Sequence, residues 1–413
     1  MTESRPRYDL ISCHDCGVLH RRRPVRPREK ARCVRCRSVL YRGIYSDAGR
    51  MAAITLAALI VYLIAQLSPI VELEVNGNAS RATLLGAILV LWQEHMPLVA
   101  TAVFLFTILL PAIELLSLLH VTLALAGGHK PRLFNPLLHA VHLARRWGMT
   151  EVLMIGILIT IVKMTSLAEV VLEPGLFAFG ALTIMLAIVV SFDPKTLWNL
   201  GDALSPQSSH TPTVPHEALS CHVCGLVSAP HKRCPRCHAR LHRRHPDSIG
   251  RTWAYLIAAA ILYVPANVLP VMYTHSLFGR EDDTIISGVL FFWNSGSPGL
   301  AAIIFIASIM VPVLKLAALS LLAWTAQHRS PWRPMQRTRL YRLVEFVGRW
   351  SMLDIFVITL TVALVRFQSL ATITAGPGAV AFCGVVILTM IASMQFDPRL
   401  IWDPLPPNGE QHV

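Results

Sequence analysis

The chain has 413 residues, of which 54% are hydrophobic and only 15% are charged, and its formal net charge is +13. A soluble domain carries about a quarter of charged residues, so this composition excludes an ordinary soluble protein. Apolar runs of roughly eighteen residues or more recur along the chain, which is the length that a helix needs to cross a bilayer. The sequence therefore predicts a multi-pass membrane protein whose basic excess lies in cytoplasmic segments.

The first fifty residues are polar and rich in arginine, with no short apolar core near the start, so we expect no cleavable signal peptide. They contain two Cys-x-x-Cys pairs, formed by Cys13, Cys16, Cys33 and Cys36. Four thiolates on two tight turns suit a tetrahedral zinc ion, and Gly17 follows the first pair as such turns often require. We predict a zinc ribbon over residues 1–48, with a closed and structural metal site.

The cysteine pairs leave other interpretations open. Iron in a rubredoxin-like site and redox-active dithiols also fit the spacing. Nearby histidines could replace a thiolate, namely His14, His20, His222, His231 and His238. The arginine-rich run at 21–30 could contact the phosphates of a nucleic acid. Its tethering close to a membrane span favours a place beside anionic lipid headgroups instead, so we do not expect a nucleic-acid partner.

Four apolar segments follow the ribbon, at roughly 51–69, 97–126, 148–168 and 175–192. The second exceeds the ~20 residues of one span, so we expect it to tilt, to kink or to extend beyond the membrane. The sequence SFDPKTLWN (191–199) closes this unit. We predict a four-helix membrane repeat over 49–200 and a Ser/Pro-rich linker over 201–216.

The chain then repeats itself at an offset of about 201 residues, which drifts slightly toward the end. Trp92 falls on Trp293, and SFDPKTLWN falls on QFDPRLIWD (395–403). The second set of cysteines is Cys221, Cys224, Cys234 and Cys237, with Gly225 after the first pair. We predict a second zinc ribbon over 217–248, a second four-helix membrane repeat over 249–403 and a tail over 404–413. The second set of spans lies at roughly 252–270, 299–326, 351–371 and 377–396.

The predicted fold is an all-α integral membrane protein of two tandem repeats. Each repeat has four transmembrane helices, eight in total, and a small zinc-ribbon-like domain precedes each. Lysine and arginine gather in 1–50 and in the loops around 129–146 and 327–349, whereas the other loops carry mainly acids. This bias places both ribbons and both termini in the cytoplasm. An even number of spans per copy makes the repeats parallel in topology.

Charged residues at membrane depth are costly and are candidates for a transport path. Glu114 lies near the middle of its span, and Lys315 takes the matching place in the second copy. A structural ion pair between the two is the alternative. Lys163 and Arg366 form a second matched pair near the periplasmic side, where the alternative is snorkelling to the interface.

Two prolines, Pro111 and Pro312, lie inside the long spans and each removes a backbone hydrogen bond. The residue four positions earlier carries a hydroxyl in both copies, and we expect a kink or a hinge there. Gln66 and Asn267, near the outer ends of the first spans, could cap the helix or line a cavity. No nucleophile elbow, zinc-protease motif or P-loop is found, so we expect no enzyme activity.

Four pairs of stretches carry a family resemblance: SPIVE and LPVMY, TLLGAILVLW and TIISGVLFFW, RRWGMTEV and GRWSMLDI, and SFDPKTLW and QFDPRLIW. With the duplicated cysteine pairs, they resemble the paraquat-inducible protein A family of Gram-negative inner membranes over nearly the whole chain. Members are partners of MCE-domain proteins, which build periplasmic tunnels for lipids. The resemblance implies that the chain loads or unloads phospholipid at the tunnel's base. Our leading hypothesis is such a lipid-transport component, which contributes to envelope integrity and has the proton gradient as its candidate energy source.

A second hypothesis is a membrane-anchored sensor or scaffold of the envelope or oxidative stress response, with the ribbons as its docking element. It predicts that Cys-to-Ser changes abolish signalling while the membrane half remains dispensable. The transport hypothesis predicts instead that substitutions at Glu114, Lys163, Lys315 or Arg366 abolish envelope function without loss of protein. Because Glu114 and Lys315 differ in charge, we expect the two halves not to share one mechanism.

Overall fold

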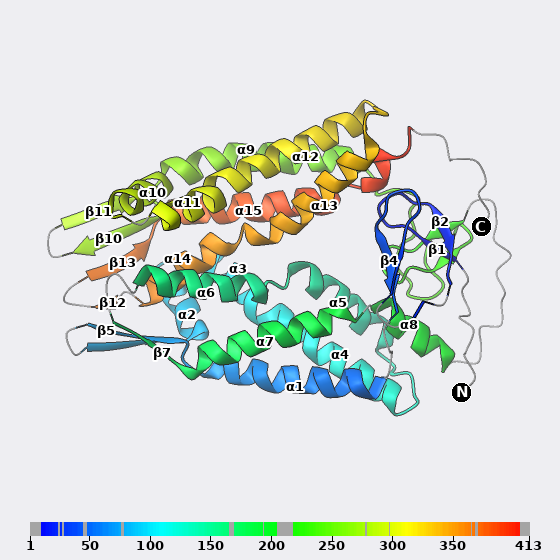
Figure 1. Ribbon diagram of the computed structural model, residues 1–413, viewed down its shortest axis with the longest axis horizontal. Helices are drawn as coiled ribbons and strands as arrows, with labels where there is room; N and C mark the ends of the chain where they lie inside the picture. The colour runs from blue at the N-terminus through cyan, green and yellow to red at the C-terminus, as the bar shows by residue number, and fades with distance from the viewer. Residues whose placement is uncertain are drawn as a thin grey trace.

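Strands gather at one end of the elongated molecule and the cysteine-bearing ribbons at the other, with long helices between them (Figure 1). We call these ends the strand end and the ribbon end. This computed structural model describes all residues except 1–9, 24, 27–28, 44–47, 76–77, 165–168, 193, 205–217, 277–278, 297, 365, 368–370 and 405–413.

The first ribbon consists of two hairpins, β1 (Leu10–Ser12) with β2 (Leu19–Arg21) and β3 (Lys30–Arg32) with β4 (Val39–Arg42). The first repeat follows, with α1 (Ala48–Leu67), β5 (Val71–Val75), β6 (Asn78–Ala82), α2 (Leu84–Gln93), α3 (Pro97–Val103), the π-helical η1 (Phe104–Leu109), α4 (Leu110–Ala126), α5 (Phe134–Trp147), α6 (Thr150–Met164), β7 (Glu169–Leu172), α7 (Pro174–Ser191) and α8 (Pro194–Ala203).

The second ribbon contains one hairpin, β8 (Leu219–Ser220) with β9 (Val227–Ser228). The second repeat follows, with α9 (Ser248–Val268), β10 (Met272–Ser276), β11 (Gly279–Asp283), α10 (Ile285–Asn294), α11 (Pro298–Phe305), the π-helical η2 (Ile306–Met310), α12 (Val311–Gln327), α13 (Pro334–Trp350), α14 (Leu353–Leu364), β12 (Arg366–Phe367), β13 (Ala371–Ala375), α15 (Pro377–Gln395) and the 3₁₀ helix η3 (Pro398–Ile401).

Local sequence explains why equivalent helices start at equivalent places. Thr83 caps α2, because its hydroxyl accepts a hydrogen bond from the backbone N–H of Gly86. Thr284 caps α10 in the same way and forms a capping box with Ser287. Helices α7 and α15 both begin with a Pro-Gly pair, where proline suits the first helical turn.

The strands form two antiparallel sheets at the strand end, ordered β6-β5-β7 and β11-β10-β13-β12. They correct the all-α prediction, since the chain is mostly helical but carries a sheet in each repeat. The end of the predicted span 351–371 is wrong for the same reason. Helix α14 ends at Leu364, and both Arg366 and Ala371 lie in strands. The alternation of Ala, Thr and Ile in β13 is typical of a strand.

Seven helices in the described part of the chain are long and apolar enough to cross a membrane: Ala48–Leu67, Pro97–Ala126, Pro174–Ser191, Ser248–Val268, Ala301–Gln327, Pro334–Leu364 and Pro377–Gln395. The predicted span 148–168 corresponds to α6, which has 15 residues and ends where the undescribed residues 165–168 begin. The eight-span topology is therefore not confirmed. The basic segments expected as loops contain helices α5 and α13.

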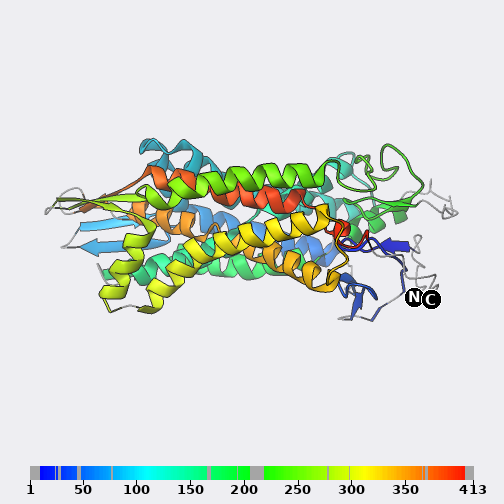
Figure 2. The ribbon, with the colours of Figure 1, turned by 90° about the horizontal axis from the view of Figure 1, so that it is seen from above.

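The two repeats share one core, to which helices of both contribute. Helix α14 packs against α6 and against α2, both from the other repeat. Leu153 of α6 and Phe356 of α14 are fully buried in the same apolar cluster. The views in Figures 1 and 2 place α6 and α14 side by side in the middle of the molecule. The repeats are therefore joined along the membrane-spanning region and not only through the linker.

Candidate functional site

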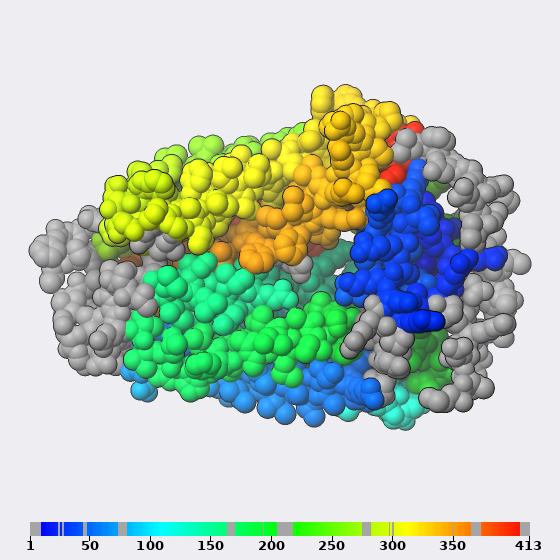
Figure 3. Space-filling model, in the orientation of Figure 1, coloured from blue at the N-terminus to red at the C-terminus, as the bar shows by residue number. Residues whose placement is uncertain are grey.

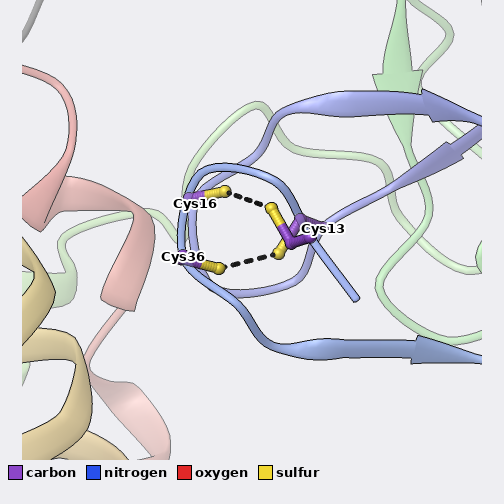
Figure 4. Close-up of side chains that lie close together, drawn as sticks. Cys13, Cys16 and Cys36 are labelled. Carbon is purple, nitrogen blue, oxygen red and sulfur yellow. Dashed lines mark hydrogen bonds between the residues drawn. The ribbon is translucent and has the colours of Figure 1, made fainter. Parts of the chain in front are cut away.

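The first ribbon brings its four cysteines together. Their sulfurs lie within 4.8 Å of one another and all four residues are buried. Cys13 Sγ lies 3.4 Å from Cys36 Sγ, and Cys16 Sγ lies 3.5 Å from Cys33 Sγ. Figure 4 shows three of the side chains pointing toward one another. Four convergent thiols without a disulfide match the donor set of a structural tetrahedral metal site.

The second ribbon repeats this arrangement. Its four sulfurs also lie within 4.8 Å of one another, with Cys221 Sγ 3.5 Å from Cys237 Sγ. In both ribbons the residue after each Cys-x-x-Cys pair has a positive φ, namely Gly17, Arg37, Gly225 and His238. The sequence predicted the two glycine turns, and the structure adds the two turns at non-glycine residues. The predicted ligand sets are therefore assembled, and they can bind a metal ion.

The thiols fit a metal ion chemically as well as geometrically. Hydrogen bonds from Cys13 and Cys16 lower the pKa of Cys33 to about 7, and bonds from Cys224 and Cys237 lower the pKa of Cys221 to about 7. The same hydrogen bonds raise the pKa of Cys16 and of Cys224, so each cluster holds thiolate and thiol groups side by side, and the thiolate is the metal-binding form. His20 Nε2 lies 3.2 Å from Cys33 Sγ, so this histidine neighbours the site without replacing a cysteine.

The first ribbon docks on the second repeat. Arg342 of α13 donates from Nε to the Asp15 carboxylate at 2.7 Å and from Nη2 to the Cys36 carbonyl at 3.1 Å. The guanidinium of Arg35 lies over the Trp402 ring, 4.9 Å from its centre. Figure 3 shows the ribbon lying against α13 at the ribbon end.

The second ribbon docks in the same way on the first repeat. His139 of α5 occupies the place that corresponds to Arg342, and its Nε2 donates to the Cys237 carbonyl at 3.0 Å. Arg236, the counterpart of Arg35, lies over the Trp198 ring and pairs with Asp202 of α8 at 2.9 Å. Each ribbon thus contacts the repeat that it does not precede in the sequence, and the end of the second ribbon, at Arg244 and His245, also bonds to Asp403 and Asp397 of its own repeat. We call this arrangement the crossed ribbons.

Glu114 has a partner within its own repeat. Its carboxylate accepts a hydrogen bond from Arg145 Nε of α5 at 2.8 Å, and both side chains are largely buried. Arg145 also donates to the carbonyls of Phe192 and Val189 at the end of α7. The alternative of an ion pair between Glu114 and Lys315 is therefore wrong, because Arg145 already pairs with the carboxylate.

Lys315 lies in the equivalent place of α12 with a different neighbour. The repeat alignment places Gly348 where the first repeat has Arg145. A Cβ atom on Gly348 would lie 3.4 Å from Lys315 Nζ, so the amine occupies space that a larger residue would fill. Lys315 is 2% exposed, and its Nζ has no hydrogen-bond partner among the described residues. Aligning the two repeats residue by residue would have revealed this exchange of Glu and Arg for Lys and Gly.

Four further polar candidates were predicted from the sequence, and the structure describes the side chains of two of them. Lys163 is the penultimate residue of α6 and Arg366 begins β12, but their side chains lie outside the described part. Arg366 therefore does not lie on a helix as expected. Gln66 is buried in α1, and neither polar atom of its side chain has a partner in the described structure. Asn267 Nδ2 donates to the Tyr263 carbonyl of its own helix.

Both prolines follow a π-helical turn. Pro111 is the second residue after η1, where Leu110 N bonds to the Leu105 carbonyl, and Pro312 is the second residue after η2. The hydroxyl of Thr107, four residues before Pro111, donates to the Val103 carbonyl at 2.7 Å. A π-turn next to proline is a usual place for a helix to bend. The hinge role of these prolines remains a proposal.

An apolar cavity of about 280 Å³ lies in the strand-end half of the second repeat. Its wall includes Ile159 of α6, Phe291 and Phe292 of α10, Ile304 of α11, Val357 of α14 and Phe382 of α15. This volume is near the roughly 300 Å³ at which ligand pockets begin. The sequence did not indicate this cavity, because its wall is formed by five helices from both repeats.

Five polar residues border the cavity, namely Thr274, Asp283, Thr284, Ser308 and Asp354. Ser308 of η2 neighbours the Asp354 carboxylate in this lining, and Asp354 Oδ2 has no hydrogen-bond partner among the described residues. Asp354 lies in the first turn of α14, where its charge also suits the helix dipole. The cavity therefore combines apolar walls with a few polar groups, among them the carboxylates of Asp283 and Asp354.

Comparisons with known proteins agree with these features. The family described as paraquat-inducible protein A matches residues 49–201 and 249–405. The chain is 35% identical to the intermembrane transport protein PqiA of Escherichia coli, over 96% of each chain. It is 30% identical to the lipophilic envelope-spanning tunnel protein A of the same species, over 97% of this chain and 93% of the relative. It is 31% identical to a probable intermembrane transport protein of Haemophilus influenzae, over 96% of each chain. No solved structure matches the chain.

Proposed function

Because the chain belongs to the paraquat-inducible protein A family, we propose that it is the inner-membrane component of a phospholipid transport system. It loads or unloads lipid at the base of an MCE-protein tunnel between the inner and outer membranes, and so contributes to envelope integrity. Two relatives are named intermembrane transport proteins and a third an envelope-spanning tunnel protein.

The apolar cavity of the second repeat is the observation that carries this proposal. A phospholipid has long apolar chains, and burial of each methylene in an apolar site is worth about 0.8 kcal/mol. The cavity wall is aliphatic and aromatic over most of its surface. Phe291 and Ile303 line it and yet remain largely exposed, so the cavity is open beside α10 and α11. An acyl chain can therefore reach it from the membrane.

Lys315 is the polar candidate with the strongest support for a transport role. A buried amine without a partner is costly in a membrane span, and such residues mark ion or substrate pathways. Glu114 takes a structural role in this proposal, because Arg145 neutralises it. The different surroundings of Glu114 and Lys315 support a division of labour between the repeats, with transport chemistry in the second. The proton gradient is the candidate energy source.

The orientation follows from the charges. The ribbon end carries the arginines of the ribbons and of α5 and α13, so it lies in the cytoplasm by the positive-inside rule. The strand end then faces the periplasm, where an MCE-domain partner would meet the two sheets. Both four-cysteine sites hold zinc in this proposal, because four thiolates in a closed site favour it.

Metal analysis of the purified protein tests the cofactor. We expect two zinc ions per chain by inductively coupled plasma mass spectrometry, and one in a Cys224→Ser variant. Iron in stoichiometric amounts would overturn the zinc assignment. A protein with no bound metal after purification under reducing conditions would overturn the metal sites altogether.

Two matched glycine variants test the lipid assignment. A Cβ at either Gly288 or Gly299 would meet no atom within 4 Å, but only Gly288 lines the cavity. We expect Gly288→Trp to lower the phospholipid that co-purifies with the protein and to sensitise cells to detergent. Gly299→Trp should do neither. Equal lipid content and equal envelope function in the two variants would overturn the cavity as the lipid site.

Co-purification with an MCE-domain protein of the same bacterium tests the partner. We expect the full-length chain to retain that protein after detergent extraction. The exposed ribbon residue Val34 offers a control, because Val34→Lys at the ribbon end should leave the complex intact. If the MCE protein never co-purifies and its deletion leaves the phenotype of this chain unchanged, the tunnel partner is wrong.

A further inference from the structure

Helices α2 and α10 are equivalent elements of the two repeats, but they are packed differently. They carry the stretches TLLGAILVLW and TIISGVLFFW and start with the same threonine cap. In α2 the inward residues Leu84, Ala87 and Leu91 are all buried. Of their counterparts in α10, only Phe292 is buried. The inward face of α10 therefore has the apolar sequence of a packed helix face, but most of it is not packed against another helix.

The partner of α2 identifies the missing partner of α10. Helix α2 packs along α14 of the other repeat, and Val90 contacts the cluster that contains Val362. By the repeat alignment, Phe291 corresponds to Val90 and Ile159 of α6 corresponds to Val362. Phe291 and Ile159 both line the cavity, and Phe291 is 62% exposed. The cavity thus occupies the place where the equivalent contact would be.

The backbone on either side of α10 and α11 contains elements that can bend. The connection between the two helices includes Gly296, whose φ is +76°. At the other end, η2 interrupts the helix just before Pro312. A π-turn beside proline lacks regular i to i−4 hydrogen bonds, so it bends at lower cost than an uninterrupted helix. Gly288 offers no side chain that would resist closure, since a Cβ there would meet nothing within 4 Å.

We propose that α10 and α11 form a lateral gate, which closes when Phe291 packs against Ile159 and opens to admit an acyl chain from the membrane. The structure holds the gate of the second repeat open, and the first repeat displays the closed arrangement in α2 and α14. The outward residues Ile286 and Leu290 of α10 are exposed and apolar, as a gate that faces lipid requires. This inference rests on the proposed function only in one respect, namely that the molecule admitted to the cavity is a phospholipid acyl chain.

Site-specific photocrosslinking of the full-length protein tests the gate. Phe291 is replaced by p-benzoylphenylalanine, which keeps the phenyl ring and adds a photoreactive benzoyl group to it, and the purified protein is irradiated in two media. One is a bulky sterol-type detergent without phospholipid, and the other is a bilayer of phosphatidylethanolamine and phosphatidylglycerol. The same replacement at Val90 is the matched control, since we expect it to crosslink to α14 equally in both media.

In the lipid-free detergent we expect position 291 to crosslink to the α6 segment around Ile159, identified by mass spectrometry. In the bilayer this crosslink should fall at least fivefold, and an adduct with phospholipid should replace it. The gate is overturned if position 291 gives no α6 crosslink in either medium while position 90 crosslinks to α14. It is also overturned if the α6 crosslink is equal in both media. The Gly288→Trp experiment tests the lipid-site assignment separately, so the two failures are distinguishable.

Discussion

Arg342 and Asp15 are 327 residues apart in the sequence and form an ion pair in the structure. Through this pair the first ribbon is attached to α13 of the second repeat. His139, the counterpart of Arg342, attaches the second ribbon to α5 of the first repeat. The crossed ribbons therefore join the two halves at the ribbon end, as α6 and α14 join them in the membrane-spanning region.

Replacing Arg342 with alanine should release the first ribbon from the second repeat while its metal stays bound. Asp15 is 1% exposed, so it would keep a buried charge with His14 as its remaining partner. Loss of one partner of a fully buried pair costs roughly 3 kcal/mol, and the cost here is smaller because Arg342 is 33% exposed. We expect faster hydrogen exchange in β1, β4 and α13, measured by mass spectrometry, with the metal content unchanged.

Arg339→Ala is the matched control, because Arg339 is an exposed residue on the same helix. It should leave hydrogen exchange in the first ribbon unaltered. The crossed attachment would be contradicted if Arg342→Ala accelerated exchange in α5 and α8 and not in α13.

Removing the metal from one ribbon should loosen the repeat on which that ribbon docks, and not the repeat that follows it in the sequence. The cysteines of the first ribbon share an apolar cluster with Tyr341 and Trp402 of the second repeat. Those of the second ribbon share one with Phe134 and Trp198 of the first. We expect Cys16→Ser to expose α13 and η3 to limited proteolysis, and Cys224→Ser to expose α5 and α8. Cleavage of the repeat that follows each mutated ribbon, with the other repeat intact, would contradict the crossing.

Much of the architecture could be predicted from the sequence, because apolar runs and repeated motifs are local signals. The metal ligands were predictable for the same reason, since each Cys-x-x-Cys pair fixes its own turn. The crossed ribbons were not, because nothing in the order of the chain tells which repeat a ribbon contacts. Asp15 and Arg342 carry no motif, and only their positions in space make them partners.

The strands were missed because they directly follow the apolar helices. In the second repeat the span was extended through Arg366 into the β-branched residues before Ala375, where hydropathy alone does not distinguish strand from helix. The cavity could not be predicted either. The cavity forms because α10 and α6 do not pack against each other there. The sequence does not show this, since α10 and its counterpart α2 share one apolar pattern.

Removing Arg145 should destabilise the first repeat more than removing both members of its ion pair. Arg145→Met leaves the Glu114 carboxylate buried without its partner, and such losses cost roughly 3–5 kcal/mol. Adding Glu114→Gln removes the isolated charge and should restore part of the stability. The recovery is incomplete, because the carbonyls of Val189 and Phe192 still lack their donor.

Thermal unfolding in detergent, followed by tryptophan fluorescence, gives the order of stability. We expect the wild type to unfold at the highest temperature, the double variant next and Arg145→Met at the lowest. The structural role of Glu114 would be wrong if Glu114→Gln alone abolished envelope function at unchanged stability and protein level.

The stability that Asp397 contributes should depend on pH in a defined direction. Asp397 closes the turn after α15, where its carboxylate accepts hydrogen bonds from Arg399 and from the backbone N–H of His245. Burial raises the pKa of this carboxyl, but the hydrogen bonds and the charge of Arg399 outweigh it and leave the pKa lowered. A lowered pKa in the folded state means that the ionised form stabilises the fold.

This contribution is fully present above the unfolded pKa of about 3.9 and is lost as the pH falls through the lower folded pKa. We therefore expect Asp397→Asn to unfold at a lower temperature than the wild type at pH 7, with a difference that shrinks below about pH 4. Asp403→Asn is the control, because Asp403 is 40% exposed in its pair with Arg244, and exposed pairs contribute at most about 1 kcal/mol. A difference for Asp397→Asn that grows as the pH falls would contradict the assignment, since it would require a raised pKa in the folded state.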